Sequence, residues 1–103
     1  MYDFYSKFKV FLDGVFEIVN KDKSHVYGNF RKVELKFGKR YAKVVVNDSA
    51  FCFVDKTNGD VLKAASFNSP AKGARGNIYD ASNGLGRVGP LGIDTKSYSN
   101  LIG

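Results

Sequence analysis

The sequence predicts an α+β domain in which an N-terminal amphipathic helix packs on a four-stranded antiparallel meander sheet, followed by a Gly-rich irregular C-terminal segment. Apolar side chains recur at helical spacing over residues 4 to 19, and from residue 26 the spacing changes to every second residue. Thirteen of the fifteen aromatic residues precede residue 68. The core is therefore expected in the first two thirds of the 103-residue chain.

The helix is predicted from one apolar stripe that continues for four turns. Its members are Phe4, Phe8, Phe11, Leu12, Val15, Phe16 and Val19. Charged residues occupy the opposite face, and Asp3 is placed to cap the first turn. A helix lying on a membrane surface usually carries more lysine on its polar face. Packing on a sheet is therefore the better interpretation.

Four strands are predicted over residues 33–37, 41–46, 51–54 and 61–65, separated by turn residues. Asn58-Gly59 fits a two-residue type I′ turn, which would set Phe53 opposite Ala64. The expected core face then holds Phe51, Phe53, Leu62 and Ala64. The expected open face, turned away from the helix, holds Cys52, Val54 and Lys63.

The C-terminal part differs in composition, because seven of the eleven glycines fall between residues 73 and 103. Each glycine raises the entropy that ordering must overcome. We expect a single domain over residues 1–80. Residues 81–103 are expected to form a Gly-rich tail that is either packed on the domain or partly disordered.

The chain is strongly basic, with a formal net charge of +6, which favours polyanionic partners through counterion release. Surface charge also serves solubility alone. Cys52 is the only cysteine, so no internal disulfide is possible and a cytoplasmic location is favoured. The N-terminal stretch carries too many charges for a signal peptide or a membrane span. No membrane partner is expected.

The sequence contains no convincing motif for catalysis or for cofactor binding. His25 is predicted to be a surface histidine and Cys52 a small strand residue, with no partner set for catalysis or metal binding. Gly84-Leu-Gly-Arg-Val-Gly89 matches G-x-G-x-x-G, but it neither follows a predicted strand nor opens a helix. We therefore expect a non-enzymatic protein with no catalytic residue, no metal and no cofactor.

Basic residues cluster in the first two strands, where six of the positions from 31 to 43 are basic against the single acid Glu34. Strand alternation places Lys32, Lys36, Lys43 and Lys63 on the open face, together with Tyr41. Lysines that track phosphates beside a ring that stacks on bases are typical of single-stranded nucleic-acid binding. The alternative is a solvated strand face on which lysine discourages edge pairing.

The segment from 66 to 77, SFNSPAKGARGN, has residues suited to begin and end a short helix. Ser69 fits an N-cap, Pro70 the first helical position and Gly76 a C-terminal stop. A single turn over 70–75 would present Lys72 and Arg75 beside free N–H groups, which suits a phosphate. The alternative is a connector whose basic residues are solvated.

The run from Asn58 to Phe67, followed by Ser69 to Tyr79, resembles a signature of small uncharacterised proteins of bacteriophages and related environmental viral sequences. The resemblance covers about residues 50 to 90. It implies a viral origin and action in the cytoplasm of an infected bacterium. It implies no catalytic residue.

Three functions compete. The first is a nucleic-acid-binding protein for single-stranded DNA or RNA, with Lys32, Lys36, Tyr41, Lys43, Lys63, Lys72 and Arg75 as the contact residues. The second is a protein-interaction module that inhibits a host factor, with a tail that orders on binding. The third is a binder of small anions or nucleotides at the turn over 70–75.

Overall fold

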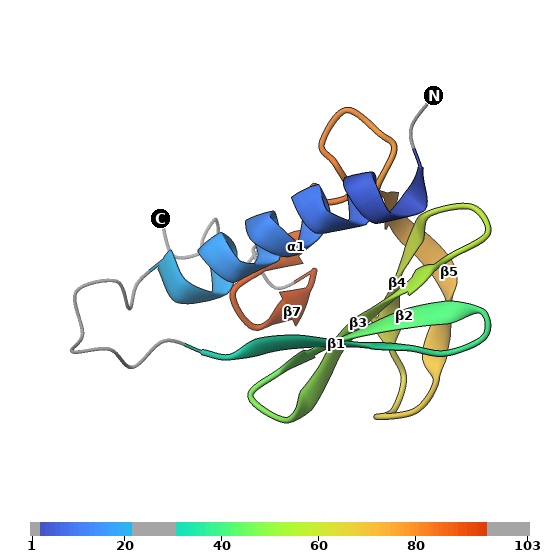
Figure 1. The fold of residues 1–103 in the computed structure, drawn as a ribbon. Helices are drawn as coiled ribbons and strands as arrows, with labels where there is room; N and C mark the ends of the chain where they lie inside the picture. The colour runs from blue at the N-terminus through green and yellow to red at the C-terminus, as the bar shows by residue number, and fades with distance from the viewer. Residues whose placement is uncertain (1–2, 22–30, 95–103) are drawn as a thin grey trace.

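The computed structural model describes residues 3–21 and 31–94. Within them, one helix lies across a five-stranded antiparallel sheet and a two-stranded hairpin packs beside the helix (Figure 1). The elements are α1 (Phe4–Asn20), β1 (Val33–Phe37), β2 (Tyr41–Val46), β3 (Ser49–Asp55), β4 (Asp60–Ala64), β5 (Pro70–Asn77), β6 (Val88–Gly89) and β7 (Gly92–Ile93). The predicted α+β class, with a helix on an antiparallel meander, is confirmed. The predicted strand count of four is wrong.

Side-chain hydrogen bonds hold both ends of α1: those of Asp3, the predicted N-cap, at the start and those of Asn20 at the end. The Asp3 carboxylate accepts a hydrogen bond from the Ser6 amide at 2.8 Å, which satisfies one of the free N–H groups of the first turn. At the other end, Asn20 is buried and its amide donates to the carbonyls of Phe16 and Arg31. Asn20 also accepts from the Arg31 amide. The helix end is thereby tied to the chain that enters β1.

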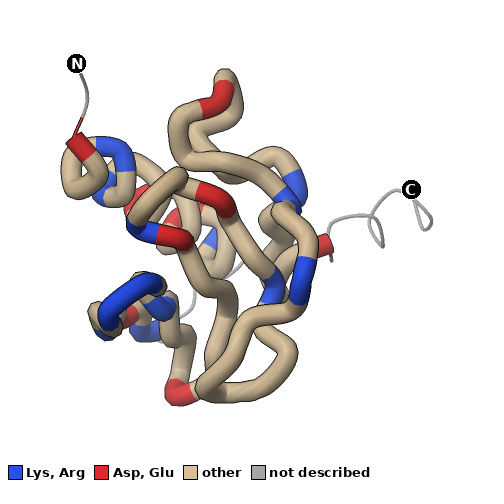
Figure 2. Tube along the Cα trace, turned by 90° about the vertical axis from the view of Figure 1, so that its right-hand side faces the viewer, with Lys and Arg blue, Asp and Glu red and all other residues tan. Residues whose placement is uncertain are grey.

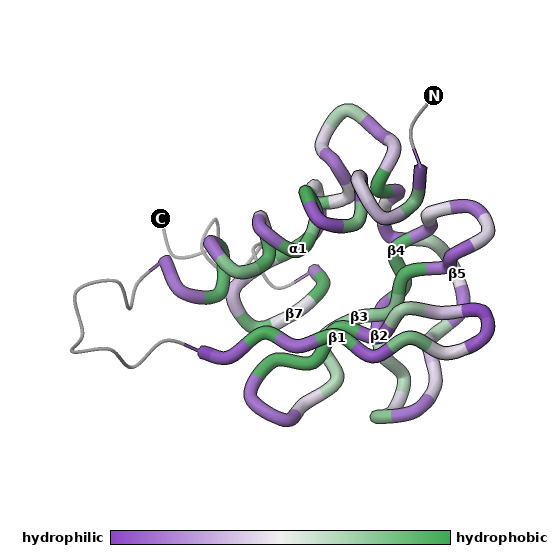
Figure 3. The backbone as a smooth tube through the Cα atoms, viewed as in Figure 1, coloured by the Kyte–Doolittle hydropathy of each residue, from purple (hydrophilic) through white to green (hydrophobic). Residues whose placement is uncertain are grey.

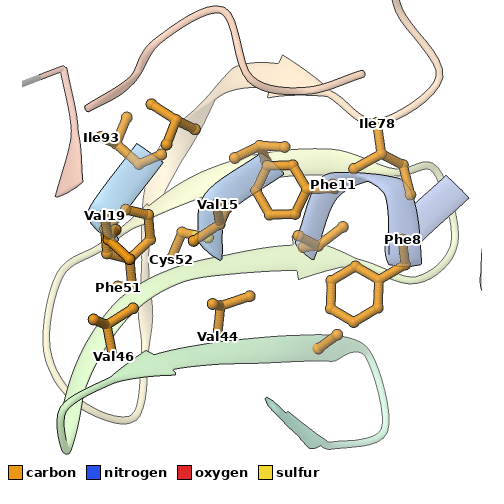
Figure 4. Packing of buried hydrophobic residues seen from close by; sticks show 14 residues of the cluster. Phe8, Phe11, Val15, Val19, Val44, Val46, Phe51, Cys52, Ile78 and Ile93 are labelled. Carbon is orange, nitrogen blue, oxygen red and sulfur yellow. The ribbon is translucent and has the colours of Figure 1, made fainter. Parts of the chain in front are cut away.

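The core lies between α1 and one face of the sheet. In Figure 3 the helix alternates between hydrophobic and hydrophilic colours along its length, as an amphipathic helix does. Figure 4 shows Phe8, Phe11, Val15 and Val19 projecting from α1 toward the strands. Their partners in the same cluster include Ala42, Val44, Val46, Phe51, Cys52, Val54, Val61 and Ile78. All of these side chains are at most 7% exposed.

The faces of β3 differ from the prediction. Cys52 and Val54 point toward α1 and are fully buried, whereas Phe53 lies on the opposite face. A bulge causes the difference: Val44 pairs with Cys52 and Val45 with Ala50, so Phe51 has no partner across the ladder. The extra residue lets Phe51 and Cys52 both enter the core. Cys52 is therefore a core residue and not an open-face residue.

The connection between β3 and β4 is also longer than the predicted two-residue loop. Asp55 closes it by accepting hydrogen bonds from the amide and hydroxyl of Thr57 at 2.8 and 2.5 Å, while the Gly59 amide donates to the Asp55 carbonyl. Phe53 then pairs with Leu62 and not with Ala64. The turn begins at Asp55 because its carboxylate organises the backbone before Asn58-Gly59 is reached.

Residues 70–77 form strand β5, so the predicted helical turn over 70–75 is wrong. Ser69 caps no helix. Its carbonyl accepts from the amides of Ala65 and Ser66 and closes the β4–β5 turn. Pro70 is tolerated because it begins an edge strand, where no N–H is needed. Asn77 secures the far end, since its amide donates to the Asn58 carbonyl and the Asp60 carboxylate.

The part of the tail that the structure describes, 81–94, is packed on the domain. Val88 in β6 and Ile93 in β7 are each 3% exposed and belong to the main core cluster. Gly84 sits in a turn with φ +82°, directly against Phe11 and Val61. The G-x-G-x-x-G run therefore lies in turns and a short hairpin, without the strand and helix of a dinucleotide site.

Candidate nucleic-acid interface

The face of the sheet turned away from α1, here called the open face, brings together three of the predicted contact residues. Lys36 and Lys43 are register partners across β1 and β2, and Tyr41 follows on the same side of β2. Alternation along β2 explains this placement. Ala42, Val44 and Val46 point into the core, so Tyr41 and Lys43 point to the opposite face. Lys36, Tyr41 and Lys43 therefore share one surface, as the alternation predicts.

A hollow of about 260 Å³ lies among these side chains and is here called the basic hollow. It is lined by Lys36, Phe37, Gly38, Lys39, Arg40, Tyr41, Lys43, Phe53 and Asn68. Four of these nine residues are basic and none is acidic. In Figure 2, which faces the closed end of the β1–β2 hairpin, basic positions are concentrated on that hairpin. The hollow therefore combines positive charge with aromatic walls.

One wall of the basic hollow comes from the turn between β4 and β5, which lies over β2. The Lys43 ammonium donates to the Asn68 side-chain oxygen at 3.2 Å and stands 3.8 Å above the Phe67 ring. Phe53 lines the same hollow and is 3% exposed although it lies outside the core cluster. The open face is thus concave and not flat.

Tyr41 stands between the basic hollow and a second hollow of about 390 Å³, and it lines both. Its ring meets Phe53 edge-on at 6.0 Å between centroids, and the Arg40 guanidinium carbon lies 5.3 Å from the ring centre. Lys72 lines the second hollow, but so do Asp55 and Asp60. The second hollow is therefore less basic than the first.

Arg40 is positioned by the buried carboxylate of Asp55, whose oxygen accepts from the Arg40 Nε at 3.0 Å. Burial alone would raise the pKa of Asp55. Hydrogen bonds from Thr57 and Arg40 outweigh it, and they hold that pKa below its ordinary value. Asp55 is thus a carboxylate at neutral pH. Its hydrogen bond also raises the pKa of Arg40.

A family model described as "Family of unknown function (DUF7717)" matches residues 12–88, which is more than half of the chain. The chain belongs to this family. The matched segment includes every residue of the basic hollow. No curated protein and no solved structure matches the chain. The function of the family is unknown.

Four predicted contact residues are not brought into the basic hollow: Lys72 lines the second hollow instead, and the other three lie elsewhere. Lys32 reaches back to Glu34 at 3.8 Å, so its charge is partly balanced. Lys63 is wrongly placed by the prediction: it pairs with Cys52 and so points to the α1 side of the sheet. Arg75 lies where the β4–β5 register shifts and is half-buried. Its Nη1 is buried and has no hydrogen-bond partner among residues 3–21 and 31–94.

Sequence reasoning missed Lys39, Arg40 and Asn68. The first two lie in the β1–β2 turn, whose basic character is visible in the sequence, but their distance from Tyr41 depends on how the hairpin closes. Asn68 follows β4 by four residues and gives no sequence signal at all. Among the residues that the structure describes, Lys36 and Lys39 have neither an ion pair nor a hydrogen bond from the side chain.

Another hollow, of about 290 Å³, lies at the opposite end of the sheet beside Phe51 and Pro90. Its one basic residue, Arg31, donates to the Pro90 carbonyl at 2.7 Å. That cation is already committed to the protein backbone. This hollow therefore lacks the unpaired charge found beside Tyr41.

The described part of the chain offers little for catalysis or metal binding. It contains no group of three His, Cys, Asp or Glu side chains that could hold a metal ion. Burial raises the pKa of the Cys52 thiol, which keeps it protonated and poorly nucleophilic. His25 lies outside the described residues. The helix in residues 3–21 is neither long nor apolar enough to cross a membrane.

Proposed function

We propose that this chain is a small basic nucleic-acid-binding protein, without enzymatic activity, that holds single-stranded DNA or RNA against the open face of its sheet. The observation that carries the proposal is the basic hollow, where Lys36 and Lys39 lie beside the ring of Tyr41. Neither lysine has an ion pair or side-chain hydrogen bond to a described residue, and no described acidic residue lines the hollow. Charges that follow phosphates and a ring that stacks on a base are the two parts of such a site.

The register of the hairpin supports the same proposal. Lys36 lies directly opposite Lys43, and like charges in that position destabilise a sheet. A bound phosphate would relieve this repulsion. The volume of about 260 Å³ lies just below the roughly 300–1,000 Å³ found for enclosed small-molecule pockets, as expected of an open surface that would contact only part of a longer strand.

The proposal assigns direct contacts to Lys36, Lys39, Tyr41 and Lys43, with Lys72 extending the path into the second hollow. We also propose that the protein is of viral origin and acts in the cytoplasm of an infected bacterium. This part of the proposal rests on the bacteriophage-like signature alone. The small-anion alternative has lost its basis, because residues 70–77 are a strand and provide no helix N-terminus.

The test is a fluorescence-anisotropy titration of a labelled single-stranded oligonucleotide at several salt concentrations. Neutralising about three phosphates predicts a slope near −2 in a plot of log affinity against log salt. A matched duplex of the same sequence should bind more weakly, because its bases cannot reach Tyr41. No binding even at low salt would overturn the proposal, and would leave a protein partner as the remaining alternative.

A further inference from the structure

The sheet has two edges, β1 and β5, and they differ in kind. β5 begins with Pro70, carries Gly73 at φ +91° and shifts register twice against β4. Proline, bulges and irregular backbone are devices that keep an edge strand from pairing with another chain. β1 carries none of them and runs against β2 in one unbroken register from Val33 to Phe37.

The outer edge of β1 presents regularly spaced backbone groups. The Gly38 amide donates to Tyr41 at 2.8 Å, and the Asn47 amide donates to Lys32 at 3.0 Å. Because hydrogen-bonded pairs alternate along an antiparallel ladder, even-numbered residues of β1 direct their backbone groups toward β2. Val33, Leu35 and Phe37 therefore direct theirs outward, where no described residue pairs with them.

The same three side chains lie on the α1 side of the sheet, where the apolar surface is left incomplete at this edge. Leu35 is 39% exposed and Phe37 is 48% exposed. Tyr5 of α1, 62% exposed, meets the Phe37 ring at 5.7 Å. An additional strand beside β1 would cover this apolar border while satisfying the outward backbone groups.

The sequence of β1, Val33-Glu-Leu-Lys-Phe37, is complementary to itself in antiparallel orientation. If Leu35 pairs with Leu35 of a second copy, Val33 faces Phe37 and Glu34 faces Lys36. The pairs at residues 33, 35 and 37 then coincide with the outward backbone groups and form about six hydrogen bonds. Glu34 and Lys36 fall at the closely spaced, non-hydrogen-bonded positions, where opposite charges stabilise most.

We propose that two copies of this chain associate through β1, in this register, to form a continuous ten-stranded sheet. The two Glu34–Lys36 pairs across the interface favour pairing with β1 of a second copy over pairing with a strand of unrelated sequence. The existing Lys32–Glu34 contact is exposed and 3.8 Å long, so it holds Glu34 only weakly. Figure 1 shows α1 on one side of the sheet. Because the two-fold axis of this pairing is perpendicular to the sheet, both copies of α1 would lie on that side and both open faces on the other.

The test is the mass in solution, measured by sedimentation or light scattering without any nucleic acid, so that its outcome is independent of the proposed binding function. As concentration rises through the micromolar range expected of a small interface, the mass should move from that of one 11.4 kDa chain toward that of two. A protein that stays monomeric throughout would overturn the proposal.

Two charge reversals give the sharpest control. Glu34→Lys sets lysine against lysine across the interface, and Lys36→Glu sets glutamate against glutamate, so each variant alone should be monomeric. An equimolar mixture restores both opposite-charge pairs and should dimerise. Circular dichroism of each variant establishes that it is folded. Folded single variants that dimerise like the parent chain, or a mixture that stays monomeric, would place any dimer elsewhere and refute this register.

Discussion

Lys36 and Lys43 lie directly opposite each other across β1 and β2, on the face of the sheet turned away from α1. Lys43 is held by Asn68 and the Phe67 ring, whereas Lys36 has no partner among residues 3–21 and 31–94. Two cations in adjacent positions cost the folded chain free energy. A phosphate bound at the proposed site would offset that cost.

Replacing Lys36 with Gln should therefore have opposite effects on stability and binding. At concentrations where the chain is monomeric, the free energy of unfolding should rise by about a few tenths of a kcal/mol, because the repulsion with Lys43 is removed. The affinity for single-stranded nucleic acid should fall, and the slope of log affinity against log salt should shrink by about 0.7. Urea unfolding and anisotropy titrations measure the two effects on the same preparation.

Lys63→Gln is the charge-matched control, since Lys63 is exposed and lies on the α1 side of the sheet. It removes the same charge from the chain. Its effect on affinity should be limited to the small, salt-screened change in net charge. Equal losses of affinity in the two variants would mean that binding senses total charge and that the basic hollow has no special role.

Tyr41 should contribute by stacking. Tyr41→Ala is expected to weaken binding by about 1–3 kcal/mol while leaving the salt slope nearly unchanged, because no charge is lost. Tyr41→Phe retains the ring and should bind almost as well as the parent chain. If both variants bind equally, the ring makes no contact with a base and the assignment of Tyr41 is wrong.

Asp55 should stabilise the fold in a pH-dependent manner. Its pKa is lowered in the folded state, so its contribution is present above the unfolded value of about 3.9 and is lost as pH falls through the folded pKa. Asp55→Ala leaves the Thr57 amide and Arg40 without their acceptor and should cost about 1–3 kcal/mol at neutral pH. The difference in free energy of unfolding between Asp55→Ala and the parent chain should become smaller in acid. Urea unfolding of both proteins at neutral pH and in acid measures this change.

Gly84 should tolerate no side chain. A Cβ there would lie 3.0 Å from the Phe11 ring and 3.2 Å from the Ile78 backbone, in addition to the strain of φ +82°. Gly73 has a similar φ of +91° with nothing within 4 Å of its Cβ position. Gly73→Ala should thus cost only the backbone strain of about 1–2 kcal/mol. Gly84→Ala should cost clearly more in thermal or urea unfolding, and equal losses would contradict the close packing of the described C-terminal turns.

Local patterns predicted much of this fold. The stripe from Phe4 to Val19 predicted α1, and alternation predicted β1 and β2 and the shared face of Lys36, Tyr41 and Lys43. These elements depend on near neighbours along the chain. The helical spacing and the strand spacing are each visible within one segment, so tertiary contacts were not needed to recognise them.

The remaining elements depend on contacts that the sequence does not display. Which face of β3 enters the core is decided by the bulge at Phe51, and the bulge inverts the assignment of Cys52 and Lys63. β5 has small residues and no clear alternation, so its pairing with β4 rests on partners such as Asn77 and Asp60, 17 residues apart. The concave wall made by Asn68 follows from that pairing.

An NMR titration of the ¹⁵N-labelled chain with a short single-stranded oligonucleotide tests most directly whether nucleic acid binds the open face around Tyr41. Amide shift changes should be concentrated at Lys36, Lys39 to Lys43, Phe53 and Asn68, with the amides of α1 nearly unaffected. Changes centred on α1, or no changes at saturating oligonucleotide, would mean that the open face is not the binding surface.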